Sequence, residues 1–314
     1  MRDLQHRLAA LGVGSIPATG AYDLSTAAAV RTFQTSRGLP ASGVCDDATW
    51  EALVEAGWRL GDRPLYRGAP MLRGDDVADL QSRLGAIGFD PGWVDGIFGP
   101  QTERALVDFQ RNYGLVADAI CGPATVGALE KLGDRLRATS SIVDVRQRER
   151  FLCGSQSLAG HAIVVAHSGA LDALATSVAR AITAGGGRGL VLSHPVGSAI
   201  AASANDAGAD ACLAFTLAAA GSTCRVAYYR SPSGWESQGG RRLAEILRDG
   251  LATIVPCAQR AVVPASVPLL RETRMPAVVV ELAAAHDVVA RTGDLAAAIP
   301  GLLDRWIAGI AGAQ

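Results

Sequence analysis

The stretch Pro276-Ala277-Val278-Val279-Val280-Glu281-Leu282 decides the fold class of the second half of the chain. Its valines are β-branched, and its apolar residues form an unbroken run instead of an alternating one. Such a run is typical of a strand covered on both faces, as in a parallel sheet between two layers of helices. Glu281 lies at the carboxyl end, which is the side where open α/β sheets bind their ligands. The stretch therefore predicts a buried strand that ends in a candidate functional acid.

Short apolar runs and helical stretches alternate from Ala162 onward. This order predicts an α/β domain with a largely parallel central sheet flanked by helices. The predicted strands are residues 162–166, 189–193, 211–215, 226–230 and 277–281. The predicted helices are residues 170–184, 196–207, 236–251 and a last one near 295–310.

The first half of the chain repeats itself at a constant offset of 76 residues, which begins with Gln5 and Gln81. The matches continue without a gap through both copies. They include Leu8 with Leu84, Gly20 with Gly96, Phe33-Gln34 with Phe109-Gln110, and Cys45 with Cys121. So many matches at one offset indicate an internal duplication.

The second copy has the pattern of three helices. Leu80, Leu84 and Ile87 form one apolar stripe, and Asp75 or Asp76 is expected to cap that helix. Pro100 and Pro123 suit the first positions of two further helices, and Asp95-Gly96 is a turn signal between the first two. Each copy is therefore predicted to be a small three-helix, all-α domain.

Three domains follow from these patterns: residues 1–57, residues 74–133 and residues 160–314. The stretches between them contain Gly, Pro, Ser and Thr and are interpreted as linkers. The second linker contains Arg146, Arg148, Glu149 and Arg150, which suit a charged helix face.

Composition limits the class of protein. The net charge of −1 gives no reason to expect nucleic acid or an anionic membrane as a partner. No apolar stretch reaches the length of a membrane span, and Met1–Arg7 lacks the apolar core of a secretory signal, so we expect a cytoplasmic protein. The six cysteines form no CxxC pair and are expected to be free thiols; Cys121 is interpreted as a small core residue.

The repeat resembles the peptidoglycan-binding-like three-helix domain found beside many cell-wall hydrolases. The resemblance rests on Leu80-Gln81, Leu84, Gly88-Phe89, Asp95-Gly96-Ile97-Phe98-Gly99, Thr102, Ala105-Leu106, Phe109-Gln110 and Gly114-Leu115. It implies that Asp95, Gly96, Phe98 and Gln110 take part in peptidoglycan binding. The first copy departs from the pattern, with Thr19 at the position of Asp95 and Asp23 at that of Gly99.

The second half resembles the zinc-dependent N-acetylmuramoyl-L-alanine amidase domain. The stretches that carry the resemblance are Ala166-His167-Ser168-Gly169, residues 209–216, Val226-Ala227-Tyr228-Tyr229, Leu269-Leu270-Arg271 and Pro276–Leu282. The family holds zinc with a His after the first strand, a Glu opening the next helix and a His ending a middle strand. A second Glu acts as general base on the metal-bound water that attacks the amide between muramic acid and L-Ala.

The resemblance carries over only in part. His167 matches the first zinc ligand, and Glu281 matches the general base. Thr216 stands at the position of the second His, and Asp172 is the nearest acid to the position of the ligand Glu. Zinc is thus the cofactor that the resemblance implies, although two of its three ligands are missing from the matching positions. The remaining histidines of this half are His161, His194 and His286.

These observations leave three functional hypotheses. The first is a peptidoglycan- or muropeptide-binding pseudo-amidase that acts in cell-wall sensing or regulation of precursor synthesis, with peptidoglycan fragments or an enzyme of precursor synthesis as partner. The second is an active zinc amidase with a rearranged metal site. The third is a scaffold whose repeats bind protein instead of glycan.

Overall fold

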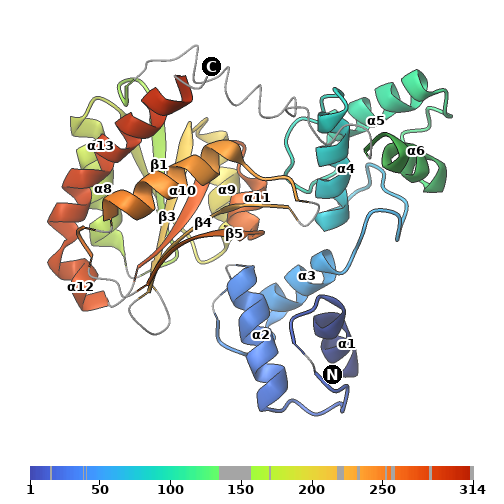
Figure 1. Ribbon diagram of the computed structural model, residues 1–314, viewed down its shortest axis with the longest axis horizontal. Helices are drawn as coiled ribbons and strands as arrows, with labels where there is room; N and C mark the ends of the chain where they lie inside the picture. Colours follow the sequence, from blue (N-terminus) through green and yellow to red (C-terminus); the bar gives the residue numbers. More distant parts are fainter. Residues whose placement is uncertain are drawn as a thin grey trace. The chain divides into compact units, whose positions relative to one another are not determined.

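The computed structural model describes residues 1–133, 157–217, 223–255, 259–282 and 285–311, apart from positions 15, 38, 40, 170, 232, 233 and 252. The chain divides into two compact units, one formed mainly by the first half of the sequence and one mainly by the second half (Figure 1). The second linker, with Arg146 and its neighbours, lies outside the described residues, as do Cys153 and Cys257.

The first repeat contains three helices: α1 (Arg2–Ala10), α2 (Leu24–Ser36) and α3 (Asp47–Ala56). Asp23 caps α2 by accepting a hydrogen bond from Thr26 N at 2.8 Å, and Asp46 caps α3 by accepting one from Thr49 N at 2.8 Å. The helices enclose a small apolar core. It consists of Leu4, Leu8, Ile16, Ala29, Val30, Phe33, Ala52, Leu53 and Ala56.

The second repeat contains α4 (Asp75–Ala86), α5 (Pro100–Tyr113) and α6 (Pro123–Gly133), so the three-helix prediction is confirmed. Pro100 is the first residue of α5, as expected. The expected cap of α4 is wrong, because Gly74 is the N-cap and both acids lie inside the first turn. There Asp75 binds Arg37 at 2.9 Å, and Asp76 binds Arg63 at 2.7 Å, so arginines hold the two carboxylates.

The second unit is built on a six-stranded sheet, and the prediction of a largely parallel sheet flanked by helices is confirmed. Its order is β2-β1-β3-β6-β4-β5. The strands β1, β2, β3 and β6 are parallel, whereas β4 runs antiparallel to β6 and parallel to β5. The strand bounds are β1 (Ala162–His167), β2 (Arg188–Ser193), β3 (Ala211–Leu217), β4 (Thr223–Tyr229), β5 (Gln259–Ala265) and β6 (Ala277–Leu282).

Helices cover both faces of the sheet. The helices α8 (Asp172–Ala184), α10 (Gln238–Leu251) and α13 (Thr292–Ala311) pack on one another and enclose the main core with the sheet. Figure 1 shows α8 and α13 side by side over the strands. The shorter α9 (Gly197–Asp206) and α11 (Pro268–Glu272) pack together on the other side, and α12 (Ala285–Ala290) precedes α13. Within the stretch Pro276–Leu282, residues Ala277–Leu282 form β6, the fourth of the six strands across the sheet.

The sequence did not predict β5, and the reason is Pro264 within it. A proline cannot donate to a strand ladder, so it argues against a central strand and is tolerated at a sheet edge. The strand β5 lies at the edge of the sheet, next to β4 alone. The short helices α11 and α12 were also missed, because five or six residues carry too little periodicity to be recognised.

Candidate functional site

Three predicted site residues lie at the same end of the sheet, because the strands β1, β3 and β6 are parallel and their carboxyl ends lie together there. His167 is the last residue of β1 and lies opposite Phe215 of β3. Thr216 of β3 lies opposite Glu281 of β6, so these two residues are neighbours on adjacent strands. Glu281 in turn lies opposite Arg225 of the antiparallel strand β4.

Strand alternation separates these residues onto two faces of the sheet. The core against α8, α10 and α13 includes Val165, Phe215 and Val280, so His167, in register with Phe215, faces that side. Thr216 and Glu281 each follow a core-facing residue by one position and therefore face the side of α9 and α11. The structure thus brings Thr216 together with Glu281 and places His167 on the opposite face.

His167 is in contact with Asp172 instead. Its side chain is 1% exposed, and its Nε2 lies 3.4 Å from Oδ1 of Asp172, the first residue of α8. This contact is not a hydrogen bond, and Nε2 is buried without a hydrogen-bond partner among the described residues. The other ring nitrogen, Nδ1, accepts a hydrogen bond from Gly169 N at 3.3 Å. In the neutral imidazole this fixes the proton on Nε2, since one nitrogen then accepts and the other carries the hydrogen.

Glu281 is held by an arginine that the resemblance did not point to. Both Nε and Nη2 of Arg225 donate to the same oxygen, Oε2 of Glu281, with Nε at 2.7 Å. The Arg225 side chain is 33% exposed and that of Glu281 is 24% exposed, so the pair is open to solvent on one side. The sequence alone does not identify Arg225 as a partner of Glu281. The signal appears only when β4 is known to pair with β6, because Arg225 then lies opposite Glu281.

The residues at this end of the sheet do not fit a zinc ion. A zinc-bound histidine usually donates its second ring N–H to a carboxylate or carbonyl, whereas Nδ1 of His167 faces an N–H donor. The positive guanidinium of Arg225 already forms an ion pair with the carboxylate of Glu281. Within the described residues, no three His, Cys, Asp or Glu side chains come close enough to hold one metal ion. A catalytic zinc site needs three protein ligands around one open position.

The other histidines do not complete a donor set. His194 follows β2 at the same edge, but it is exposed, and its Nδ1 accepts a hydrogen bond from Val196 N at 3.0 Å. His161 precedes β1 at the opposite edge, with Nδ1 3.4 Å from Oδ2 of Asp210. His286 is 84% exposed and lies beside Asp287.

In the second repeat, the predicted peptidoglycan-binding residues take part in internal contacts. Asp95 Oδ1 accepts hydrogen bonds from Gln81 Nε2 at 2.8 Å and from Ile97 N at 2.9 Å. Gly96 has a φ of +70°, a left-handed conformation that favours glycine, and its N–H donates to Gln81 Oε1 at 2.8 Å. Phe98 lies fully inside the core. Their role in glycan binding stays a prediction.

Gln110 belongs to a structural arrangement that occurs four times among the described residues of the first unit. Its Nε2 donates to Asp118 Oδ1, Ile120 O and Thr125 Oγ1, and its Oε1 accepts from Ala119 N. Gln5, Gln34 and Gln81 are equally buried and bridge a loop and a helix in the same way. A buried side-chain amide that satisfies loop backbone groups explains why glutamine recurs at these positions of the repeat.

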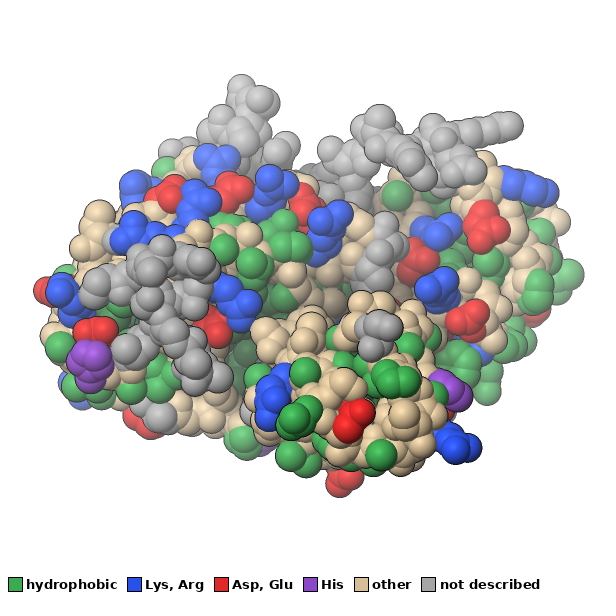
Figure 2. Space-filling view, turned by 60° about the horizontal axis from the view of Figure 1, so that its bottom comes forward, with side chains coloured by type: hydrophobic (Ala, Val, Ile, Leu, Met, Phe, Trp, Pro, Cys, Tyr) green, Lys and Arg blue, Asp and Glu red, His purple; other side chains and the backbone are tan. Residues whose placement is uncertain are grey.

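The first unit also contains exposed apolar and aromatic side chains, and the charges of the molecule are mixed. Tyr113 and Val116 are exposed beside the end of α5, and Leu24 and Val44 are exposed in the first repeat. Figure 2 shows basic and acidic side chains interspersed over the visible face. No helix among the described residues combines the length and the apolar character needed to cross a membrane.

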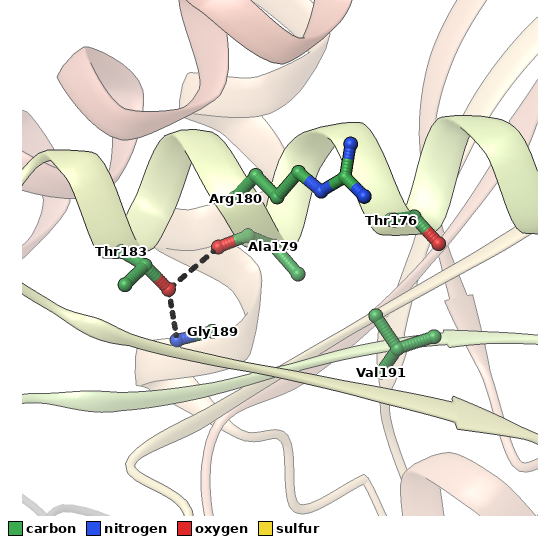
Figure 3. A pocket seen from close by; sticks show the side chains of 6 residues that line it. All are labelled: Thr176, Ala179, Arg180, Thr183, Gly189 and Val191. Atoms are coloured by element: carbon green, nitrogen blue, oxygen red, sulfur yellow. Dashed lines mark hydrogen bonds between the residues drawn. The ribbon is translucent and has the colours of Figure 1, made fainter.

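A shallow groove of about 290 Å³ lies between α8 and the edge strand β2, away from Glu281. Figure 3 shows Thr183 in its wall, where the hydroxyl donates to Ala179 O at 2.9 Å and accepts from Gly189 N at 3.3 Å. Arg180 is the one charged residue in its lining. Its lining contains no acid–base pair, so Glu281 with Arg225 and Thr216 remains the better candidate site.

Comparison with known proteins finds one matching family model and several relatives that are similar over part of the chain. The model of the peptidoglycan binding domain family matches residues 1–53 and 73–129. A Mycobacterium tuberculosis protein named N-acetylmuramoyl-L-alanine amidase CwlM is 44% identical over 164 residues, which cover 52% of this chain and 40% of that protein. The chain carries two peptidoglycan-binding domains, which an amidase-like domain follows in the sequence.

Two further relatives are similar to this chain over shorter stretches. A Bacillus licheniformis protein named N-acetylmuramoyl-L-alanine amidase CwlL is 32% identical over 155 residues, which cover 42% of this chain and 43% of that protein. A spore cortex-lytic enzyme of Bacillus cereus is 46% identical over 72 residues, 23% of this chain and 27% of that enzyme. The chain thus spans about two fifths of the length of the two amidases.

Proposed function

We propose that the chain is a peptidoglycan- or muropeptide-binding amidase homologue that no longer cleaves the muramic acid–L-Ala amide. One observation carries the proposal: His167 and Glu281, which match a zinc ligand and the general base, lie on opposite faces of the sheet. Arg225 in addition donates two hydrogen bonds to Oε2 of Glu281. A zinc amidase needs a metal-bound water within reach of its general base. The groups that would bind and activate that water are too dispersed here to do so.

The role that suits such a protein is sensing or regulation. The two repeats would bind peptidoglycan fragments or precursors, and the amidase-like domain would bind a stem peptide without cutting it. An enzyme of cell-wall precursor synthesis is the proposed protein partner. A cytoplasmic location belongs to the same proposal, and fractionation of cells with an antibody against the chain tests it.

A second candidate is an active zinc amidase with a rearranged metal site. His167 favours it, because its Nε2 is buried without a hydrogen-bond partner and lies beside the carboxylate of Asp172. This version requires a ring flip or a change of tautomer at His167 and further ligands that move towards it. It predicts that His167→Ala abolishes turnover.

The test combines hydrolysis and binding. The full chain is incubated with purified muropeptides and added zinc, and release of L-Ala peptides is followed by mass spectrometry. In parallel, sedimentation with purified sacculi measures binding. The proposal predicts co-sedimentation without release of peptide. Release that His167→Ala abolishes would establish the second candidate, and absence of co-sedimentation would favour a scaffold whose repeats bind protein.

A further inference from the structure

We propose that Arg225 and Glu281 form a metal-independent binding site for a peptide that carries a carboxylate close to an amide N–H group. The inference rests on the proposed function, since it names the part of a wall fragment that the amidase-like domain recognises. The site lies on the α9 and α11 side of the sheet, at the end of β6 and the start of β4.

The ion pair leaves hydrogen-bonding groups for a ligand. Both donating nitrogens of Arg225 converge on Oε2 of Glu281. Among the described residues, no hydrogen bond joins Nη1 of Arg225 or Oε1 of Glu281 to another group. A free guanidinium nitrogen is a donor to carboxylates, and a free carboxylate oxygen is an acceptor for N–H groups.

Exposure distinguishes this pair from an ion pair that only supports the fold. Arg271 and Glu272 form such a pair on α11, where the side chains are 3% and 7% exposed. Arg225 and Glu281, by contrast, are 33% and 24% exposed, so a ligand can reach them without unfolding of the sheet. Thr216 is half-buried and lies beside Glu281 on β3. Three adjacent strands thus present a hydroxyl, a carboxylate and a guanidinium, at neighbouring positions about 5 Å apart.

The charges select the ligand class. A metal cation is disfavoured, because the guanidinium already neutralises Glu281 and would repel a second positive charge. A phosphate dianion is disfavoured, because the carboxylate of Glu281 lies next to the only cation of the pair. A single carboxylate can bind Arg225 while a neighbouring amide N–H donates to Glu281. A short peptide with a free carboxylate provides both groups.

The test compares two probes and three forms of the full chain. The probes are N-acetylmuramoyl-L-alanyl-D-isoglutamine and its analogue with the free carboxylate converted to a carboxamide. Calorimetry measures both affinities for the wild-type chain, for Arg225→Met and for Arg230→Met. Arg230 is an exposed arginine just after β4, so it is a matched control for loss of one positive charge.

The proposal predicts that the wild-type chain binds the carboxylate probe at least about tenfold more tightly than the carboxamide, as expected for a charged hydrogen bond. Arg225→Met should lose that preference, whereas Arg230→Met should keep it. The double variant Arg225→Met/Glu281→Gln, which leaves no unpaired charge, should also lose it and shows whether instability of the single variant matters. Equal binding of both probes by the wild-type chain, or no binding of either, overturns this inference even if sacculi still co-sediment; an unchanged preference in Arg225→Met overturns it as well. Failure to co-sediment concerns the proposed function alone.

Discussion

Replacement of Gln81 by alanine is expected to open the loop that carries Asp95 and Gly96 while the rest of the second repeat stays folded. The two hydrogens of Nε2 are shared among Asp95 Oδ1, Ile97 O and Thr102 Oγ1, and Oε1 accepts a hydrogen bond from Gly96 N. A hydrogen bond of this kind contributes about 1 kcal/mol net, and a buried group left unpaired costs about 1–3 kcal/mol. Because water can reach part of the loop, we expect a loss of about 3–5 kcal/mol in the free energy of local opening.

Hydrogen exchange followed by mass spectrometry measures this loss in the full chain. A factor of ten corresponds to about 1.4 kcal/mol, so amides of residues 94–103 should exchange about 10²- to 10⁴-fold faster in Gln81→Ala. Gln101→Ala is the control, since Gln101 is an exposed residue of the same repeat and its replacement should change the free energy by less than about 0.5 kcal/mol. Exchange in Gln81→Ala that is accelerated less than about tenfold would refute the assignment of this glutamine to the loop.

Three further predictions concern single residues. Burial raises the pKa of Cys121 and of Cys212 to about 12, so both thiols stay protonated at about pH 8 and should resist alkylation in the native chain; rapid labelling of either, seen in peptide maps, would contradict their burial. A Cβ at Gly189 would lie 2.2 Å from Ala179 O, whereas one at Gly127 would meet nothing within 4 Å. Gly189→Ala should therefore lower the free energy of unfolding by more than about 2 kcal/mol, and the helical Gly127→Ala should raise it by about 0.5–1 kcal/mol, with equal effects in thermal unfolding counting against the close approach. Hydrogen bonds from Thr26 N and Ser25 hold the pKa of Asp23 at about 2, below its ordinary value of 3.8. The stabilisation of α2 by this carboxylate is therefore present above about pH 4 and is lost as the pH falls through about 2. NMR titration of the carboxyl group should show this pKa, and Asp23→Asn should remove the pH dependence.

The sequence predicted the elements that have strong periodicity. The run Pro276–Leu282 identified a strand covered on both faces, and the structure places it inside the sheet. The offset of 76 residues identified two three-helix domains, because matching core and turn positions require matching folds. Edge strand β5 escaped, since Pro264 argues against a strand unless the edge position is known.

The candidate site could be predicted only in part, because strand ends are visible in the sequence and strand faces are not. His167 is the last residue of β1 and Glu281 the last but one of β6, so both lie at the same end of the parallel strands, as expected. Their separation onto opposite faces depends on register, and a shift of one residue reverses the face. Arg225 could not be assigned to Glu281 without the order of the strands, since β4 is adjacent to β6 although β5 lies between them in sequence. The sequence shows that glutamine recurs at matching positions of the two repeats. The hydrogen bonds that each of these side chains makes are visible only in the structure.

The central claim is that the amidase-like domain lacks a competent zinc site, and metal analysis of the full chain tests it most directly. The chain is purified without chelator, equilibrated with a small excess of zinc, passed through a desalting column and analysed by inductively coupled plasma mass spectrometry. Our account predicts zinc far below one ion per chain, with no difference between the wild type and His167→Ala. One zinc per chain that is lost in His167→Ala would contradict it.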